Sequence, residues 1–186
     1  MSDGVAVAAV DVVLSPIEAF DERVDALVDR LRGRPAIDRL MYTASEVADF
    51  SLLWHVIGTG RGLRSDRHLR EAVRLSTVLG LESTVVNMGL KSLFQRDRPI
   101  PEFERPHHLR MPLTSSFPSG HASAAFCAAG LLSEHNPWAP LYYAAAVVVT
   151  TSRVHVKIHH ASDVLAGAVV GTAMAVITRR LWRLAQ

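Results

Sequence analysis

Apolar stretches, separated by short polar segments, fill most of the sequence after residue 36. They run roughly over Ile37–Ile57, Leu69–Phe94, His121–Ser133, Trp138–Ser152 and Val164–Thr178. Glycine and proline interrupt them at Gly58–Gly62, Pro99–Pro118 and Pro137, and we expect a turn at the first of these. The alternating pattern typical of β-strands is scarce. The sequence therefore predicts an all-α fold, a helical bundle.

Residues Pro16 to Leu31 precede these stretches and have apolar side chains at helical spacing, with Asp, Glu and Arg between them. This pattern predicts an amphipathic helix that lies on a membrane surface or covers a core. The chain thus divides into an N-terminal amphipathic helix region, 1–36, and a helical domain, 37–186. Asp11 interrupts the earlier apolar run Val5–Leu14, and no basic residue precedes that run, so we expect no cleaved signal peptide.

The apolar stretches are slightly short for membrane spans, which need about 20 residues. Glu71, Arg74 and Glu82 also weaken the second stretch. The last stretch, however, contains no charge, ends in arginines, and places small residues at a spacing that lets helices approach closely in lipid. These small residues are Ala166, Gly167, Ala168 and Gly171. We therefore expect an integral membrane protein with about five transmembrane segments rather than a soluble bundle.

The charge of the chain argues against a nucleic-acid binder, and its cysteine content against an internal disulfide. Twenty Lys and Arg are nearly balanced by 18 Asp and Glu, giving a formal charge of +2, so we expect no nucleic-acid partner. Cys127 is the single cysteine and cannot form an internal disulfide. Its alanine-rich surroundings predict a small packed side chain.

Three patches far apart in the sequence share one chemical character. They are Lys91 with Arg98–Pro99, then Pro118–Ser119–Gly120–His121, then Ser152–Arg153 with His159 and Asp163. A phosphoryl group in transfer spreads negative charge over three oxygens, which Lys91, Arg98 and Arg153 can stabilise. Ser119 and Gly120 precede an apolar helix, whose N-terminal N–H groups bind anions. The set therefore suits phosphoryl transfer without a metal, and we expect no cofactor.

The two histidines can divide the chemistry between nucleophile and acid. Asp163 lies four residues after His159 and would share a helical face with it. A carboxylate at one ring nitrogen fixes the tautomer and leaves the other nitrogen free to attack phosphorus. His121 is then the candidate acid for the leaving oxygen.

Together the three patches resemble the three-part signature of the type 2 phosphatidic acid phosphatase (PAP2) superfamily. All signature positions are present, from Lys91 to Asp163. The resemblance implies a compact helical catalytic domain, a phosphohistidine intermediate and metal-independent hydrolysis. It implies that His159 is the nucleophile, Asp163 its orienting partner and His121 the acid. It also implies a phosphate pocket made by Lys91, Arg98, Ser119, Gly120 and Arg153.

Several local features admit other interpretations. The stretch His155–His160 departs from relatives, which commonly have a glycine here and then a His followed by an aromatic residue and proline. His155 and His159 could be an i, i+4 metal pair, but nearby cations oppose this. His107 and His108, with Arg105 and Arg110, lie in a loop that could reach the substrate headgroup.

The order of the patches also predicts a topology. All three would lie at one membrane face, while the loop with Arg61, Arg64, Arg67 and Arg70 and the C-terminal Arg179, Arg180 and Arg183 would lie at the other. By the positive-inside tendency the arginine-rich face is cytoplasmic, so the patches face the extracytoplasmic side of the cell membrane.

We therefore expect a phosphatase acting on a lipid phosphate or diphosphate, with membrane lipids as its surroundings. Polyprenyl diphosphate, phosphatidate and phosphatidylglycerol phosphate are the candidate substrates, the first preferred by analogy alone. The same resemblance covers soluble acid phosphatases and vanadate-dependent haloperoxidases. A catalytically silent lipid-binding protein is the alternative from another class. The sequence leaves the oligomeric state open.

Overall fold

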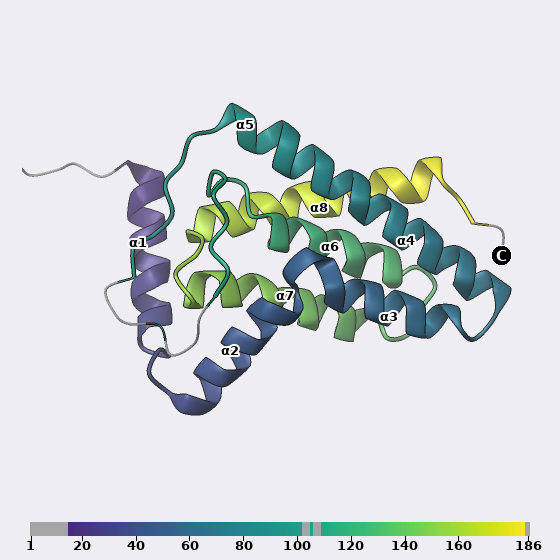
Figure 1. Ribbon diagram of the computed structural model, residues 1–186, viewed down its shortest axis with the longest axis horizontal. Coiled ribbons are helices and arrows are strands. Elements are labelled where there is room, and N and C mark those ends of the chain that lie inside the picture. Colours follow the sequence, from purple (N-terminus) through teal and green to yellow (C-terminus); the bar gives the residue numbers. More distant parts are fainter. Residues whose placement is uncertain (1–14, 102–104, 106–108, 185–186) are drawn as a thin grey trace, which may run out of the picture.

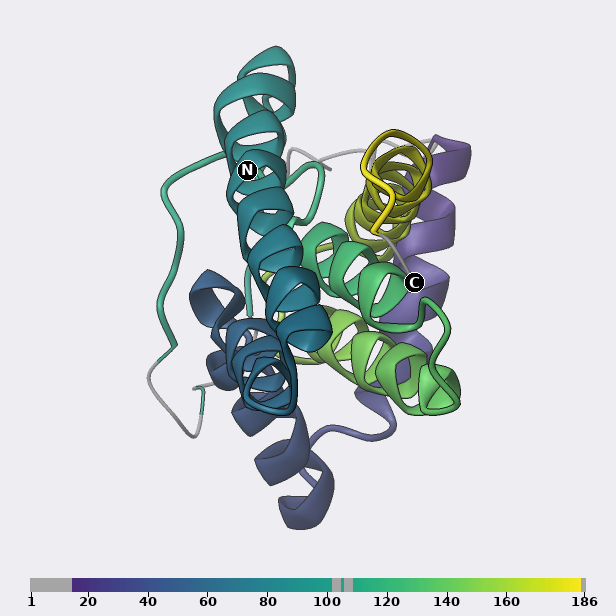
Figure 2. The same ribbon diagram turned by 90° about the vertical axis from the view of Figure 1, so that its right-hand side faces the viewer.

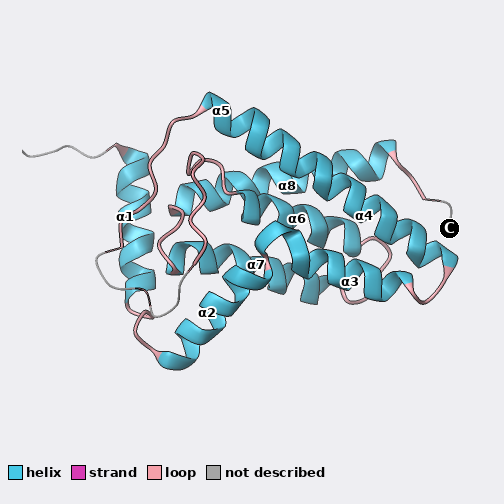
Figure 3. Cartoon of the chain, in the orientation of Figure 1, coloured by secondary structure: helices cyan, strands magenta, loops and turns pink. Residues whose placement is uncertain are grey.

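The computed structural model describes residues 15–101, 105 and 109–184, and in this part every regular element is helical (Figure 3). The all-α prediction is therefore confirmed. The elements are α1 (Pro16–Asp29), α2 (Pro35–Val47), the 3₁₀ turn η1 (Asp49–Ser51), α3 (Leu52–Gly62), α4 (Asp66–Thr84), the π-helical turn η2 (Val85–Leu90), α5 (Lys91–Leu93), α6 (Gly120–Leu132), α7 (Ala139–His155) and α8 (Ala161–Leu181).

The long helices form a bundle around α6. Helix α6 packs against α8, α7 and α4, and α3 packs along α4. Helix α1 crosses one end of the bundle and contacts α7 and α8 (Figures 1 and 2). Ser15 begins α1 with a capping box, in which Glu18 accepts from the Ser15 N–H at 2.8 Å. The predicted amphipathic helix at 16–31 is thus α1, whose apolar side contributes Val28 to a core cluster.

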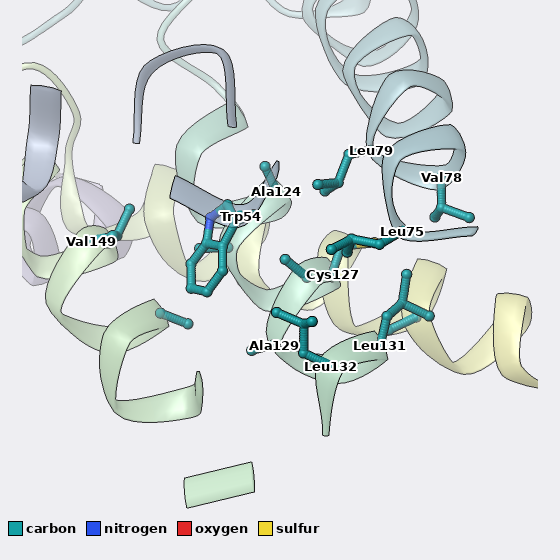
Figure 4. Packing of buried hydrophobic residues seen from close by; sticks show 14 of the residues in the cluster. Trp54, Leu75, Val78, Leu79, Ala124, Cys127, Ala129, Leu131, Leu132 and Val149 are labelled. Carbon is teal, nitrogen blue, oxygen red and sulfur yellow. The ribbon is translucent and has the colours of Figure 1, made fainter. Parts of the chain in front are cut away.

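The main core lies between α3, α4, α6 and α7 (Figure 4). Trp54 of α3 is 1% exposed, and Leu75 and Leu79 of α4 are equally buried. Small residues of α6 fill the centre and allow these larger side chains to approach it. Cys127 is among them and fully buried, so its prediction as a small packed residue is confirmed.

Glycines of α8 bring it into backbone contact with α6. A Cβ on Gly167 would lie 2.4 Å from the carbonyl oxygen of Ser119, and one on Gly171 would lie 2.0 Å from that of Ser123. No residue with a side chain fits at either position without moving a backbone. The small-residue spacing of the last apolar stretch therefore marks a close helix crossing, as expected.

The turn expected at Gly58–Gly62 is wrong, because these residues lie within α3. A Cβ on Gly58 would lie 2.7 Å from Leu75 Cδ2, and one on Gly62 would lie 3.2 Å from Ala72 Cβ. The glycines thus permit α3 and α4 to pack closely. The chain turns after them, and Ser65 caps α4 by accepting from the His68 N–H.

The first apolar stretch, expected from Ile37 to Ile57, is two helices rather than one. α2 ends at Val47, and Phe50 and Ser51 have positive φ angles of 53° and 59° before α3 begins. Non-glycine residues in this left-handed region carry strain, which tends to accumulate at functional sites. The break turns Asp49 toward the N-terminus of α6.

The charges that weakened the second stretch lie on the inner side of α4. Arg74 is 2% exposed and forms an ion pair with Glu134, and Glu82 is 1% exposed. Glu71 forms ion pairs with Arg61 and Arg67. The outer side of α4 exposes Leu69, Val73 and Leu81 together with polar side chains such as Arg70 and Ser76.

Helix α8 is the one helix of the described part that is long and apolar enough to cross a membrane. α6 is apolar but shorter. The expected count of about five transmembrane segments therefore stays a prediction.

Candidate active site

The three patches of the sequence meet at one end of the bundle. Lys91 begins α5, the last turn of the continuous helix formed by α4, η2 and α5. Arg98 follows in the loop, and His121 lies in the first turn of α6. Arg153 lies in the last turn of α7 and Asp163 in the first turn of α8. The α3–α4 turn and the C-terminal end of α8 lie at the opposite end (Figure 1). The three patches thus meet at one end of the bundle, and the expectation that this end lies at one membrane face stays a prediction.

His159 and Asp163 are both buried, at 2% and 0% exposure. His159 Nδ1 lies 3.5 Å from Asp163 Oδ2 and 3.4 Å from Ser116 Oγ. The sequence predicted that His159 and Asp163 share one face of a helix. This is not so, because α8 begins at Ala161 and His159 lies before it. The contact forms instead because the Asp163 carboxylate turns back over the helix N-terminus and accepts from the His160 N–H at 2.9 Å.

The second ring nitrogen of His159 faces a guanidinium group. Nε2 lies 3.2 Å from Arg98 Nη1. Arg98 is held by backbone carbonyls, donating to Ile158 at 3.0 Å and to Thr114 and Ser115 at 3.1 and 3.2 Å. With Nδ1 toward the carboxylate, Nε2 is the ring nitrogen that faces the cations.

Two further cations complete this region. Lys91 is 7% exposed and donates from Nζ to Thr114 Oγ1 at 3.3 Å, so Thr114 joins Lys91 to Arg98. Arg153 is 2% exposed and donates to Ser45 Oγ of α2. The charges of Arg98 and Arg153 repel the Lys91 ammonium group, which shows that the three cations lie near one another.

Donors in this cluster are left without acceptors. Arg98 Nε and Arg153 Nε are buried and have no hydrogen-bond partner among the described residues. Buried donors of this kind usually have a partner, and an anion between the two guanidinium groups would provide it.

The N-terminus of α6 offers further donors. Ser119 is its N-cap and accepts from the Ala122 N–H at 3.4 Å, while its own N–H donates to the Asp163 carbonyl at 3.0 Å. Ser119 therefore positions the helix and links it to α8. The N–H groups of Gly120 and His121, which begin α6, are the donors this leaves for an anion.

His121 has a carboxylate partner that the sequence analysis missed. His121 Nε2 lies 2.9 Å from Asp49 Oδ1. Burial of the His121 ring opposes its protonation, and the carboxylate of Asp49 offsets part of this effect by favouring the charged ring. An ionised Asp49 can orient the His121 ring and stabilise its protonated form.

Ser116 and Arg96 were also missed, although both touch Asp163. Ser116 Oγ donates to Oδ2, and Arg96 Nη1 donates to Oδ1 at 2.6 Å. Arg96 lies two residues before Arg98, and Ser116 lies two residues before Pro118. Their position next to signature residues was the only feature of the sequence that could have indicated a role in the site. Asp49 gave none, because it lies 72 residues from its partner.

Burial determines the protonation state of the nucleophile candidate. It lowers the pKa of the His159 ring to about 3, and the Asp163 carboxylate offsets only part of the effect. Arg153 and Arg98 add to the lowering. The ring is therefore neutral near pH 7, as a nucleophilic imidazole must be.

A cleft of about 680 Å³ lies beside the cations. Lys91, Arg98 and Thr114 line it together with Phe94 and Leu113. Leu113 and the neighbouring Leu93 are largely exposed, so apolar side chains stand at the border of a cationic cleft.

The remaining candidate residues have other surroundings. His155 Nε2 contacts Asp38 Oδ1 at 2.8 Å, which ties α7 to α2. His107 and His108 lie outside the described residues. Arg105 donates to the carbonyls of Val156 and Lys157 at 3.2 and 2.9 Å and supports the α7–α8 turn.

Comparison with known proteins agrees with the signature. The sequence model of the PAP2 superfamily matches residues 71–185, which contain all three patches. This chain belongs to the PAP2 superfamily.

One PAP2 relative is YbjG of Escherichia coli (strain K12), a protein named for a proposed undecaprenyl-diphosphatase activity. The two are 30% identical over 124 residues, which cover 66% of this chain and 61% of YbjG.

Two solved structures share the fold. The first is a transmembrane PAP2-type phosphatidylglycerolphosphate phosphatase from Bacillus subtilis, with a TM-score of 0.69 and 24% identity, covering 93% of this chain and 91% of that one. The second is Aquifex aeolicus LpxE, with a TM-score of 0.66 and 22% identity, covering 87% and 95%.

Proposed function

We propose that this PAP2 protein is an integral-membrane hydrolase that removes phosphate from a lipid phosphate or diphosphate. The observation that carries the proposal is the setting of His159. One ring nitrogen faces a buried carboxylate and the other faces Arg98, at the edge of a cluster of three cations. Membership of the superfamily and the name of YbjG support the reaction class.

The geometry supports a two-step reaction. In the first step the lone pair of His159 Nε2 attacks phosphorus, a P–N bond forms, and the P–O bond to the leaving group breaks. Protonated His121 donates its proton to the departing oxygen. In the second step neutral His121 takes a proton from water, the water oxygen attacks phosphorus, and the P–N bond breaks with its electron pair returning to Nε2. Lys91, Arg98 and Arg153 stabilise the charge throughout.

The surface supports the membrane location. Large apolar side chains are exposed on α3, α4 and α8, and several lie four residues apart on the same helix face. Such pairs are Leu52 and Val56, Leu69 and Val73, and Leu165 and Val169. Exposed apolar faces of this kind are suited to contact with lipid.

The deciding experiment measures phosphate release in detergent with excess EDTA, from a polyprenyl diphosphate and from phosphatidate. We expect wild-type activity to persist in EDTA and His159→Asn to abolish it. The matched control is His135→Asn, because His135 is exposed in the distant α6–α7 turn and Asn tolerates its positive φ of 51°. The faster substrate identifies the class, and we propose polyprenyl diphosphate.

Other outcomes would contradict specific parts of the proposal. Loss of activity in EDTA would contradict metal-free chemistry, and full activity of His159→Asn would exclude His159 as the nucleophile. Lipid binding without turnover would support a silent binding protein. Recovery of active protein in the soluble fraction would favour the soluble acid phosphatase or haloperoxidase classes.

We also propose that the active site faces the extracytoplasmic side, because the arginine-rich turn and C-terminus lie at the opposite end. Leu113→Cys at the cleft and Leu63→Cys at the α3–α4 turn test this in intact cells. Both leucines are highly exposed, and Cys127 is buried. We expect a membrane-impermeant maleimide to label only the first variant; labelling of only the second would reverse the orientation.

A further inference from the structure

We propose that Arg96 and Asp21 are positioning residues for the nucleophile, so that the amphipathic helix α1 holds the His159–Asp163 pair in its reactive geometry. Arg96 is outside the recognised signature, and Asp21 lies in the N-terminal region that the family match does not include. The inference rests on the proposed function, because it concerns the same nucleophile.

Arg96 joins α1 to the catalytic carboxylate. Its Nη1 donates to Asp163 Oδ1 at 2.6 Å and to Ser162 Oγ at 2.7 Å. Its Nη2 donates to Asp21 Oδ2 at 2.6 Å. The guanidinium group therefore donates one hydrogen bond to each carboxylate. The planar guanidinium group of arginine can bridge two carboxylates in this way, whereas the single ammonium group of lysine cannot.

Arg96 determines which oxygen of Asp163 faces the nucleophile. Because Arg96 and Oδ1 are paired, Oδ2 is the oxygen that faces His159 Nδ1 and accepts from Ser116 and the His160 N–H. Without Arg96 the carboxylate could rotate about its Cβ–Cγ bond, and Nδ1 would lose a fixed partner. The tautomer with the lone pair on Nε2 would then be less strongly favoured.

Asp21 is the only carboxylate of α1 in the described part that is nearly buried, at 5% exposure. Oδ1 accepts from the Ser162 N–H at 2.7 Å, and Oδ2 accepts from Ser162 Oγ at 2.7 Å. Asp21 thus caps the first turn of α8, which also carries Asp163. The negative charge of Asp21 also offsets the positive charge of Arg96. The negative charge of Asp163 can then stabilise the positive charge that the His159 ring gains when Nε2 bonds to phosphorus.

Two more contacts dock α1 beside the nucleophile. Asp25 forms an ion pair with Lys157, which has a positive φ of 53° in the α7–α8 turn. Arg32, just after α1, donates to the carbonyls of Val154 and His155 at 2.9 and 2.8 Å. A cavity of about 260 Å³ between α1 and this turn is lined by both Asp21 and His159. Helix α1 is therefore one wall of the nucleophile's surroundings.

The test compares Arg96→Gln and Asp21→Asn with Arg23→Gln in detergent. Arg23 lies on the same helix as Asp21 and is exposed, so the control makes the same substitution as Arg96→Gln away from the site. We expect Arg96→Gln to lower kcat about 10- to 100-fold, as loss of an orienting partner does elsewhere. Asp21→Asn should lower kcat less, and KM should stay within about twofold, because neither residue touches substrate.

Conservative and double variants separate positioning from folding. Arg96→Lys should not restore kcat, because one ammonium group cannot bridge two carboxylates, whereas Asp21→Glu should restore part of it. Adding Asp21→Asn to Arg96→Gln should cause little further loss, since both act through Asp163. Thermal unfolding in the same detergent must show that each variant is folded at the assay temperature.

The outcomes distinguish this inference from the proposed function. If the wild type is active, His159→Asn is inactive, and folded Arg96→Gln and Asp21→Asn match Arg23→Gln, the positioning role is wrong and the proposed function stands. Additive losses in the double variant would also overturn it. If the wild type releases no phosphate, or His159→Asn retains full activity, the proposed function fails first.

Discussion

At the scale of single residues, the site contains two histidines, each with a buried or half-buried carboxylate. His159 faces Asp163, and His121 faces Asp49 at 2.9 Å. The pairs differ in their surroundings, because Arg98 lies at the second nitrogen of His159. This difference supports the proposed roles, in which His159 attacks phosphorus and His121 donates the proton.

Asp49→Asn should therefore impair protonation of the leaving group. We expect kcat with a lipid phosphate to fall about 10-fold or more, within the range that general acids contribute. The loss should be smaller with p-nitrophenyl phosphate, whose leaving group needs little protonation. Asp66→Asn, at an exposed position of the opposite end, is the control. An equal loss with both substrates would show that Asp49 does not act through the acid.

The neutral state of His159 predicts how stability depends on pH. In the folded protein the pKa of the ring is about 3, whereas its ordinary value is 6.5. Below pH 6.5 the unfolded chain binds the additional proton, so stability should fall as the pH falls from about 6.5 toward 3, by up to about 1.4 kcal/mol per pH unit. Between pH 7 and pH 5 the thermal midpoint should drop less in His159→Gln than in the wild type. Equal drops would contradict a buried neutral ring.

At the scale of elements, the crossing of α6 and α8 fixes the distance between Ser119 and Asp163. Ser119 caps α6 and donates through its N–H to the Asp163 carbonyl at 3.0 Å. Gly167 and Gly171 allow this approach, because their missing Cβ atoms leave room for the backbone of α6. The helix packing and the site geometry thus depend on the same residues.

Gly171→Ala should separate these helices. The added Cβ would lie 2.0 Å from the Ser123 carbonyl oxygen, so we expect a loss of at least about 2 kcal/mol in unfolding free energy and reduced activity. Gly80→Ala in α4 is the control, because no neighbouring atom lies within 4 Å of its Cβ. That variant should gain about 0.5–1 kcal/mol. Thermal unfolding in detergent measures the stability of both variants. Similar midpoints for Gly171→Ala and Gly80→Ala would show that α6 and α8 do not cross in close contact.

At the scale of the whole molecule, charge and apolar surface are separated. Arg74 and Glu82 of α4 are buried in the bundle, while large apolar side chains such as Leu69, Val147 and Val169 are exposed on the helices. The cationic cleft lies at one end of the bundle and the arginine-rich turn at the other (Figure 1). This arrangement suits a lipid substrate whose phosphate enters the cleft while its tail remains in the bilayer.

Val169→Arg tests whether the outer face contacts lipid. Val169 is 69% exposed near the middle of α8, and a charge at the centre of a spanning helix costs about 2.5–3.5 kcal/mol. We expect a strong decrease of protein in the membrane fraction. Leu63→Arg, 85% exposed after α3, should leave the level unchanged. A normal level of Val169→Arg would indicate that this face contacts water.

The sequence determined the features that local physical chemistry controls. Runs of apolar residues located α6, α7 and α8, the small residues of α8 marked the helix crossing, and the residue types of the three patches identified the phosphate chemistry. The break between α2 and α3 was missed because Phe50 and Ser51 give no local signal for a positive φ. Gly58 and Gly62 were misplaced because glycine serves both turns and close helix contacts, which only packing distinguishes.

Only the tertiary structure decided the partners of the predicted residues. Asp49 reaches His121 across 72 positions, and Asp21 reaches Arg96 across 75. Such pairs form only when helices pack so that the two side chains point toward each other. The residues next to each side chain in the sequence do not determine this. The patches could therefore be predicted from the sequence, whereas the groups that orient them required the assembled bundle.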